Sequence, residues 1–253
     1  MNKIVTASFD KNKLDVGLIR IEKATRDTFA LSLQARATKV DVVPMSISAM
    51  TVDLVGPGGT FGRLDLPAFK MGFFSGDIRV HNQVIQILDM RAFQAFVSAI
   101  MQDEDLVLRL ESRRATVKAI GLTATLPYKK ELHLKGLANL RSTLIHAKEI
   151  GSDVIRSTFC VSNPSPFEID LGTVMYRALN ENGDVIGEQK GETFLMRGGE
   201  SYFILEGHIA KPMSHGEAVF VAIDVEGDSW VKQIIGLVDI KATIPNGFKV
   251  WHV

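Results

Sequence analysis

The chain has 253 residues, of which 46% are hydrophobic, and its 29 basic and 29 acidic residues give no net formal charge at neutral pH. Nucleic acid is therefore not expected as the main partner, because binding to phosphates requires an excess of lysine and arginine. The single cysteine, Cys160, excludes an internal disulfide, and its apolar surroundings predict a buried, inert thiol.

No signal for membrane insertion or export is found in the sequence. There is no run of about 18 apolar residues, so no membrane span is expected. The first residues, MNKIVTASFDKNK, lack the apolar core of a secretory signal peptide. These two observations predict a cytoplasmic protein.

Alternating apolar residues predict short strands through the first half of the chain. The clearest alternation lies in residues 29–37, where every second side chain is apolar, and a Gly-Pro-Gly-Gly turn follows the strand expected at 47–55. Pro67 favours the edge or the end of a strand, because proline cannot donate a backbone hydrogen bond. The strands expected in this half are 3–9, 14–21, 29–37, 47–55, 78–88, 106–110 and 115–126, together with a short edge-like segment at 61–67.

One helix interrupts these strands, over residues 89–102. Asp89 is suited to cap its first turn. Phe93, Phe96 and Ile100 recur at spacings of three and four, which places them in one apolar stripe. We interpret this stripe as a face packed against the core.

The second half again predicts strands and turns. Residues 127–151 are interpreted as the joint between two halves, and Asn163-Pro164-Ser165-Pro166 as a turn. Asn182-Gly183 predicts a tight hairpin. Residues 216–225 fit a strand or a helix equally well. The strands expected in this half are 154–161, 169–179, 185–187, 193–196, 201–205 and 231–244.

The two halves resemble each other most clearly in their closing segments. Residues 117–137 and 236–253 both contain an alternating strand, a Leu-Pro or Ile-Pro pair and a last strand. This similarity predicts an all-β protein of two tandem Ig-like or fibronectin-III-like antiparallel β-sandwich domains. The expected domains are residues 1–137, which include the helix 89–102, and residues 138–253.

The second half resembles the type 2 late-embryogenesis-abundant (LEA-like) domain, a β-sandwich family. The resemblance rests on Val161-Ser162-Asn163-Pro164, on Leu171-Gly172-Thr173-Val174 and on residues 182–187, NGDVIG. Residues 67–101 resemble the fungal branch of that family, whose function is unknown. The resemblance implies a β-sandwich fold in both halves and is nearly silent on activity.

The motifs of common enzyme classes are missing from the sequence. There is no GxGxxG fingerprint, no GxxxxGK[ST] phosphate loop, no HExxH and no GxSxG elbow. The six histidines are scattered, so neither a metal site nor a cofactor is expected.

Several polar and aromatic residues remain as candidate site residues. His81, Asn82, Gln83 and Gln86 interrupt an apolar strand, where they are suited either to line a pocket or to form the polar outer face of the sheet. The histidines can act as acids or bases near neutral pH. Catalytic candidates are His81, His146 and His208, and binding candidates are His81, Asn82, Gln83, Gln86, Tyr128, Trp230 and Trp251.

Three functions are compatible with these features. The first is a non-catalytic binding module that holds an apolar small molecule or a partner protein at the domain junction or at the ends of the sandwiches. The second is a cofactor-independent cyclase or isomerase of fungal natural-product biosynthesis, which needs a shaped apolar pocket and one or two polar groups. The third is a structural or stress-protective protein.

Overall fold

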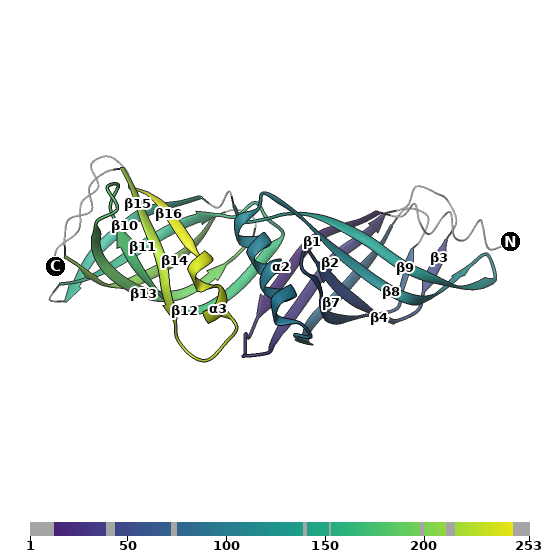
Figure 1. The fold of residues 1–253 in the computed structure, drawn as a ribbon. Coiled ribbons are helices and arrows are strands. Elements are labelled where there is room, and N and C mark those ends of the chain that lie inside the picture. The colour runs from purple at the N-terminus through teal and green to yellow at the C-terminus, as the bar shows by residue number, and fades with distance from the viewer. Residues whose placement is uncertain are drawn as a thin grey trace. The chain divides into compact units, whose positions relative to one another are not determined.

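The structure is a computed structural model that describes residues 13–38, 44–71, 75–138, 141–151, 153–197, 200–210 and 216–244. These residues are almost entirely strands, with two short helices and one 3-10 turn among them (Figure 1). The all-β expectation is therefore confirmed. The strand expected at residues 3–9 lies outside the described residues.

The chain forms two compact units. In its described part, unit 1 consists of residues 13–23, 27–99 and 105–135, and unit 2 of residues 24–26, 100–104 and 136–244, with the gaps given above. The main division falls after Lys135, whereas the sequence analysis placed it after Leu137.

Unit 1 contains two antiparallel sheets. In the first sheet β2 pairs with both β1 and β7. In the second, β8 pairs with β9 on one side and with β3 and β4 on the other, and these pair in turn with β6 and β5. The bounds are β1 Lys13–Glu22, β2 Thr28–Thr38, β3 Met45–Ile47, β4 Met50–Gly56, β5 Gly59–Leu66, β6 Phe69–Met71, β7 Ser75–Gln86, β8 Asp105–Ala119 and β9 Leu122–Lys135.

The expected helix is present as α2, Met90–Gln102, and its cap is the expected one. The backbone N–H of Ala92 donates to the Asp89 carboxylate at 3.0 Å. Phe93 stacks on Phe29 of β2 with ring centroids 5.0 Å apart, and Phe96 stacks on Phe61 of β5 at 4.6 Å. The apolar stripe therefore fixes the helix to both sheets of unit 1.

The break in alternation within residues 78–88 is a β-bulge. Between Leu33, opposite Val80, and Leu31, opposite Gln83, β7 carries one residue more than β2. Asn82 accommodates this extra residue with a left-handed φ of 46°. Ser32 supports the bulge, because the backbone N–H of Asn82 donates to its hydroxyl at 3.0 Å.

The expected joint, residues 127–151, contains the division between the units, although most of it is strand. The single strand expected at residues 115–126 is wrong. These residues do not form one strand but turn back at Ile120-Gly121, the two-residue loop between β8 and β9, a long hairpin in Figure 1. Pro127 lies inside β9, opposite a bulge at Arg113-Arg114, where the ladder requires no N–H from it. The turn was missed because both φ values are positive, 51° and 71°, which is rare for isoleucine.

Unit 2 is a single sheet that closes on itself. Its strands follow the order β13-β14-β11-β10-β16-β15-β12, and β12 pairs again with β13. Only β10 and β16 are parallel. Cys160 is half-buried on β11, not fully buried as expected. The bounds are β10 Arg141–Gly151, β11 Val154–Ser162, β12 Phe167–Leu179, β13 Val185–Leu195, β14 Glu200–Ile209, β15 Gly216–Val225 and β16 Asp239–Ile244.

Both turns expected in unit 2 are confirmed. Asn163 is buried, accepts a hydrogen bond from the Ser165 backbone N–H at 2.9 Å, and donates to the Phe167 carbonyl at 2.9 Å. Gly183 supplies the positive φ, 80°, that the Asn180–Asp184 turn requires.

Two ambiguous segments of unit 2 are decided by packing. Residues 216–225 form a strand, β15. The continuous strand expected at 231–244 is wrong, because helix α3, Val231–Ile234, and a 3-10 turn, Ile235–Leu237, precede β16. Trp230, Val231 and Ile234 are buried at helical spacing, and this local period overrides the strand-forming tendency of the residues.

The two units share a pattern of strand pairing. If β3 and β4 count as one interrupted strand, and β5 and β6 as another, each unit has seven strands in its described residues. In both, the first strand pairs with the second, the second with the fifth, the third with the fourth and sixth, and the sixth with the seventh. When the sequences of the two closing segments are aligned, residues 122–127 correspond to residues 240–245. The sequence similarity therefore falls on the seventh strands, β9 and β16.

Among the described residues, no helix is long and apolar enough to cross a membrane.

Replacing Ile120 by glycine is expected to raise the free energy of unfolding by about 1 kcal/mol. The left-handed backbone of a β-branched residue costs about 1–3 kcal/mol, and removing that strain outweighs the roughly 0.5–1 kcal/mol of backbone entropy that glycine loses on folding. Urea unfolding with an unchanged slope measures the difference. The control, Thr123→Gly in the adjacent strand, is expected to lower stability, and an equal loss in both variants would contradict the account of strain.

Candidate functional site

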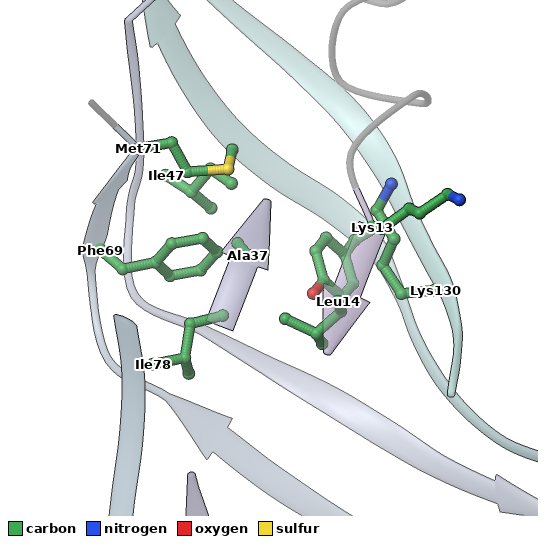
Figure 2. A pocket seen from close by; sticks show the side chains of 9 residues that line it. Lys13, Leu14, Ala37, Ile47, Phe69, Met71, Ile78 and Lys130 are labelled. Atoms are coloured by element: carbon green, nitrogen blue, oxygen red, sulfur yellow. The ribbon is translucent and has the colours of Figure 1, made fainter. Parts of the chain in front are cut away.

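An apolar pocket lies in unit 1, between its two sheets (Figure 2). The lining residues come from six strands, β1, β2, β3, β6, β7 and β9, which no short sequence motif spans. They are Lys13, Leu14, Ala37, Ile47, Phe69, Met71, Ile78, Tyr128 and Lys130.

The pocket combines an apolar interior with positive charge on one side. Figure 2 shows the apolar side chains of Phe69, Met71 and Ile78 facing Leu14, with both lysine ammonium groups on the side away from Phe69 and Ile78. The free volume is about 10 Å³, which is room for about one water molecule. A larger ligand must therefore displace a lining side chain.

Met71 is the lining side chain best suited to move. It also lines a neighbouring surface hollow of about 360 Å³, together with residues of β3, β6 and the β8–β9 turn. Methionine is unbranched and has three rotatable side-chain bonds, so it changes rotamer more easily than the β-branched isoleucines. Met71 therefore lies between the interior pocket and the open surface hollow.

Tyr128 is the one binding candidate that the structure places in this pocket. It is buried, at 3% exposure, on the inward face of β9, two residues before Lys130. Burial raises the pKa of the Tyr128 phenol well above its ordinary value, because the phenolate would lose its hydration. The phenol therefore stays neutral at physiological pH and can donate a hydrogen bond.

The polar candidate residues of β7 do not line the apolar pocket. His81 and Asn82 are exposed at the bulge, and neither is among the residues that line the apolar pocket. Gln83 exchanges hydrogen bonds with Asp65, and Gln86 donates to Asp27 at 3.0 Å. These residues therefore fit the interpretation as the polar outer face of the sheet. The bulge at Asn82 is a second reason why the alternation of apolar residues is interrupted.

The remaining catalytic candidates are not brought together. His146 of β10 and His208 of β14 are both exposed. On the intervening strand β11, His146 pairs with Thr158 and His208 pairs with Val154. Four residues along one strand correspond to about 13 Å, so the two imidazoles cannot share a proton directly. His81 belongs to unit 1.

Of the two tryptophans proposed for binding, one is a core residue. Trp230 is buried in unit 2, at 1% exposure, and its backbone N–H donates to the Thr25 carbonyl at 2.9 Å. Trp251 lies outside the described residues. No group of three or more potential metal ligands occurs within the part of the chain that the structure describes.

Sequence reasoning missed most of the pocket. Leu14, Ile47, Phe69, Met71 and Ile78 look like ordinary core residues, and only their convergence distinguishes them. One signal was available for Lys130. It shares the inward face of β9 with Tyr128 because side chains two residues apart point the same way, although the Lys129-Lys130 pair was interpreted as solvated charge.

Comparison with known proteins adds little about function. A family model described as "Protein of unknown function (DUF3712)" matches residues 59–177, which run from β5 to β12. The comparison with curated proteins gave no match.

Two of the matching solved structures have low identity and low TM-scores. A Salmonella enterica SafA pilin in complex with the SafB chaperone is 11% identical, with 92% of this chain and 95% of that chain covered and a TM-score of 0.20. The calcium-binding domain CBD12 of CALX1.1 is also 11% identical, with 89% and 99% covered and a TM-score of 0.19.

The buried phenol of Tyr128 predicts an alkaline limit to stability. Below about pH 10 the phenol is neutral in the folded and the unfolded chain, so it adds no pH dependence. Above that pH the unfolded chain loses the proton while the folded chain retains it, because the folded-state pKa is raised, and stability falls as the pH rises. Tyr128→Phe should show a smaller fall in urea titrations at alkaline pH, and an identical fall in both proteins would contradict this.

Proposed function

We propose that this protein is a non-catalytic binding module that holds an apolar small molecule at the end of unit 1, in the pocket beside Tyr128. The observation that carries the proposal is the convergence of apolar side chains from six strands on a pocket that adjoins a surface hollow through Met71. A ligand larger than a water molecule would enter by displacing the flexible Met71 side chain, which lines both the pocket and the hollow.

The polar groups of the pocket suit a binding role. The neutral Tyr128 phenol can orient a ligand with one hydrogen bond, and Lys13 and Lys130 stand at one side of an otherwise apolar lining. A few polar groups in an apolar pocket is the usual composition of a small-molecule site. A partner protein remains the second kind of ligand in this proposal, and a cytoplasmic location remains the prediction of the sequence.

For the fold we propose two tandem Ig-like or fibronectin-III-like sandwiches of the LEA-like family. The five strand pairings common to both units support a duplication, as do the Asn163 and Gly183 turns on which the resemblance rests. The ring of unit 2 is closed by two further pairings, β10 with β16 and β13 with β14. The proposal treats these as additions to a common seven-strand pattern.

Filling the pocket should abolish ligand binding. Ala37→Leu adds three carbon atoms to a side chain that lines the pocket, and we expect it to lower the affinity for the neutral apolar dye Nile red at least about tenfold, a loss that corresponds to about 1.4 kcal/mol. Dye fluorescence measures the affinity. The matched control is Ala178→Leu, an equally buried position in unit 2.

The two variants separate binding from folding. Both introduce an overpacked leucine and are expected to lose about 1–3 kcal/mol of stability, but only Ala37→Leu should lose the dye. If the original protein does not bind Nile red, or if Ala37→Leu binds it normally, the pocket is not the binding site.

The alternative is a cofactor-independent cyclase or isomerase of fungal natural-product biosynthesis. The observation in its favour is the Tyr128 hydroxyl, a neutral hydrogen-bond donor in an apolar pocket, which is suited to stabilise charge that develops on a carbonyl oxygen of a bound substrate. Lys130 lies beside it in the lining.

Loss of the Tyr128 hydroxyl distinguishes the two functions. If the protein is an isomerase, Tyr128→Phe should lower kcat by about a hundredfold in an identified reaction and leave ligand affinity nearly unchanged. Turnover of apolar polyketide or terpenoid substrates, followed by mass spectrometry, is the measurement. An unchanged kcat would remove Tyr128 from the chemistry.

A further inference from the structure

The turn of the β8–β9 hairpin violates the sequence rules for its own geometry. A two-residue loop with two positive φ values normally carries Asn-Gly, but here it carries Ile120-Gly121. Ile120 is 70% exposed, so its side chain gains almost nothing from burial within the chain. A residue that costs backbone strain and exposes an aliphatic side chain to water is expected where a partner covers that side chain.

The hairpin is also strongly basic in a chain that has no net charge. Residues 112–130 contain five lysines and arginines and no aspartate or glutamate. Lys118 is exposed two residues before Ile120, and Lys70 of β6 lines the same surface hollow. Figure 1 shows the hairpin turn projecting at one end of unit 1.

Two described acidic residues of unit 1, one on β8 and one on β7, are paired with basic side chains. Glu111 receives Arg109 and Lys129, each at 3.5 Å. Asp77 of β7 forms ion pairs with Arg36, at 3.2 Å, and with Arg79. No acidic side chain is among the described residues that line the hollow beside the turn, so these residues present the positive charge of Lys70 and Lys118 beside an apolar tip.

Other exposed aliphatic residues lack these surroundings. Val84 is 68% exposed, but its neighbours Gln83 and Gln86 donate hydrogen bonds to the aspartates Asp65 and Asp27, so its surroundings are acidic rather than basic. Val185 follows the acidic Asp184 directly. Neither Val84 nor Val185 has a left-handed backbone. Aliphatic exposure, strain and basic charge coincide only at Ile120 among the described residues.

We propose that the tip of the β8–β9 hairpin, Ile120 and Gly121 with Lys118 and Lys70 behind it, docks on a membrane surface that contains anionic lipids. Ile120 enters the boundary between headgroups and acyl chains, and the lysine ammonium groups remain among the lipid phosphates and carboxylates. This inference concerns a surface separate from the interior pocket and stands whether or not the pocket binds a ligand.

A lipid surface fits this tip better than nucleic acid does. Nucleic acid would be attracted by the lysines and arginines, but an aliphatic side chain at the tip of a hairpin has no favourable place on a phosphate backbone. An anionic membrane offers negative charge at its surface and hydrocarbon beneath it.

Cosedimentation of the full chain with vesicles tests the proposal. The protein should bind vesicles of phosphatidylcholine and phosphatidylserine, should not bind phosphatidylcholine alone, and should dissociate at high salt, because screening shortens the reach of the lysine charges to about 3 Å at 1 M. Ile120→Asn should weaken binding by about ten- to hundredfold, since asparagine tolerates the left-handed backbone but has no aliphatic surface. Lys118→Gln should weaken it about fivefold.

Matched variants serve as controls. Val84→Asn removes an equally exposed aliphatic side chain elsewhere in unit 1, and Lys232→Gln removes an exposed lysine of unit 2, so both should bind vesicles as the original protein does. Thermal unfolding should show that Ile120→Asn is at least as stable as the original chain, which excludes misfolding as the cause of lost binding.

Several results would overturn the proposal. These are failure to bind the mixed vesicles, equal binding to phosphatidylcholine alone, or an Ile120→Asn variant that binds as well as the original. Tighter binding to a single-stranded oligonucleotide than to vesicles, with no effect of Ile120→Asn, would assign the basic hairpin to nucleic acid instead.

Discussion

Stacking of phenylalanine rings on helix α2 determines the internal layout of unit 1. Phe93 and Phe96 pack against Phe29 and Phe61, which belong to different sheets, so the helix holds the sheets together at one end of their strands. Gly58 permits this contact, because a Cβ there would lie 2.8 Å from the Cβ of Ala95. Phe29 and Ala37 are eight residues apart on β2, or about 26 Å. The helix therefore closes one end of the unit, and the pocket lies towards the other.

The β8–β9 hairpin connects the proposed pocket with the proposed docking tip. It carries Tyr128 and Lys130 into the pocket lining and Ile120 to its own tip. The bulge at Arg113-Arg114 shifts the register of the ladder and accommodates Pro127, so that Tyr128 points inward beyond it. A single element thus relates an interior site to a surface one, with Met71 in contact with both.

Local patterns predicted the elements whose geometry is local. The alternation of residues 29–37, the Asp89 cap and the Asn182-Gly183 turn were all identified correctly, because each depends on neighbours within a few residues. The failures have specific causes. The turn at Ile120 was not predicted because isoleucine rarely adopts a left-handed backbone. The helical segment at residues 231–237 was not predicted because the spacing of its apolar residues fits a strand as well as a helix.

The sequence by itself determined that the chain is all-β, where most strands and turns lie, and that the motifs of common enzyme classes are missing. Strand alternation and turn chemistry are properties of adjacent residues, so they can be interpreted without the fold. The tertiary structure decided which apolar side chains surround a pocket, which polar candidates are merely bulge or surface residues, and that the ring of unit 2 is closed. These depend on contacts between strands far apart in the chain, and one added residue in a strand, as at Asn82, reverses the face that every later side chain occupies.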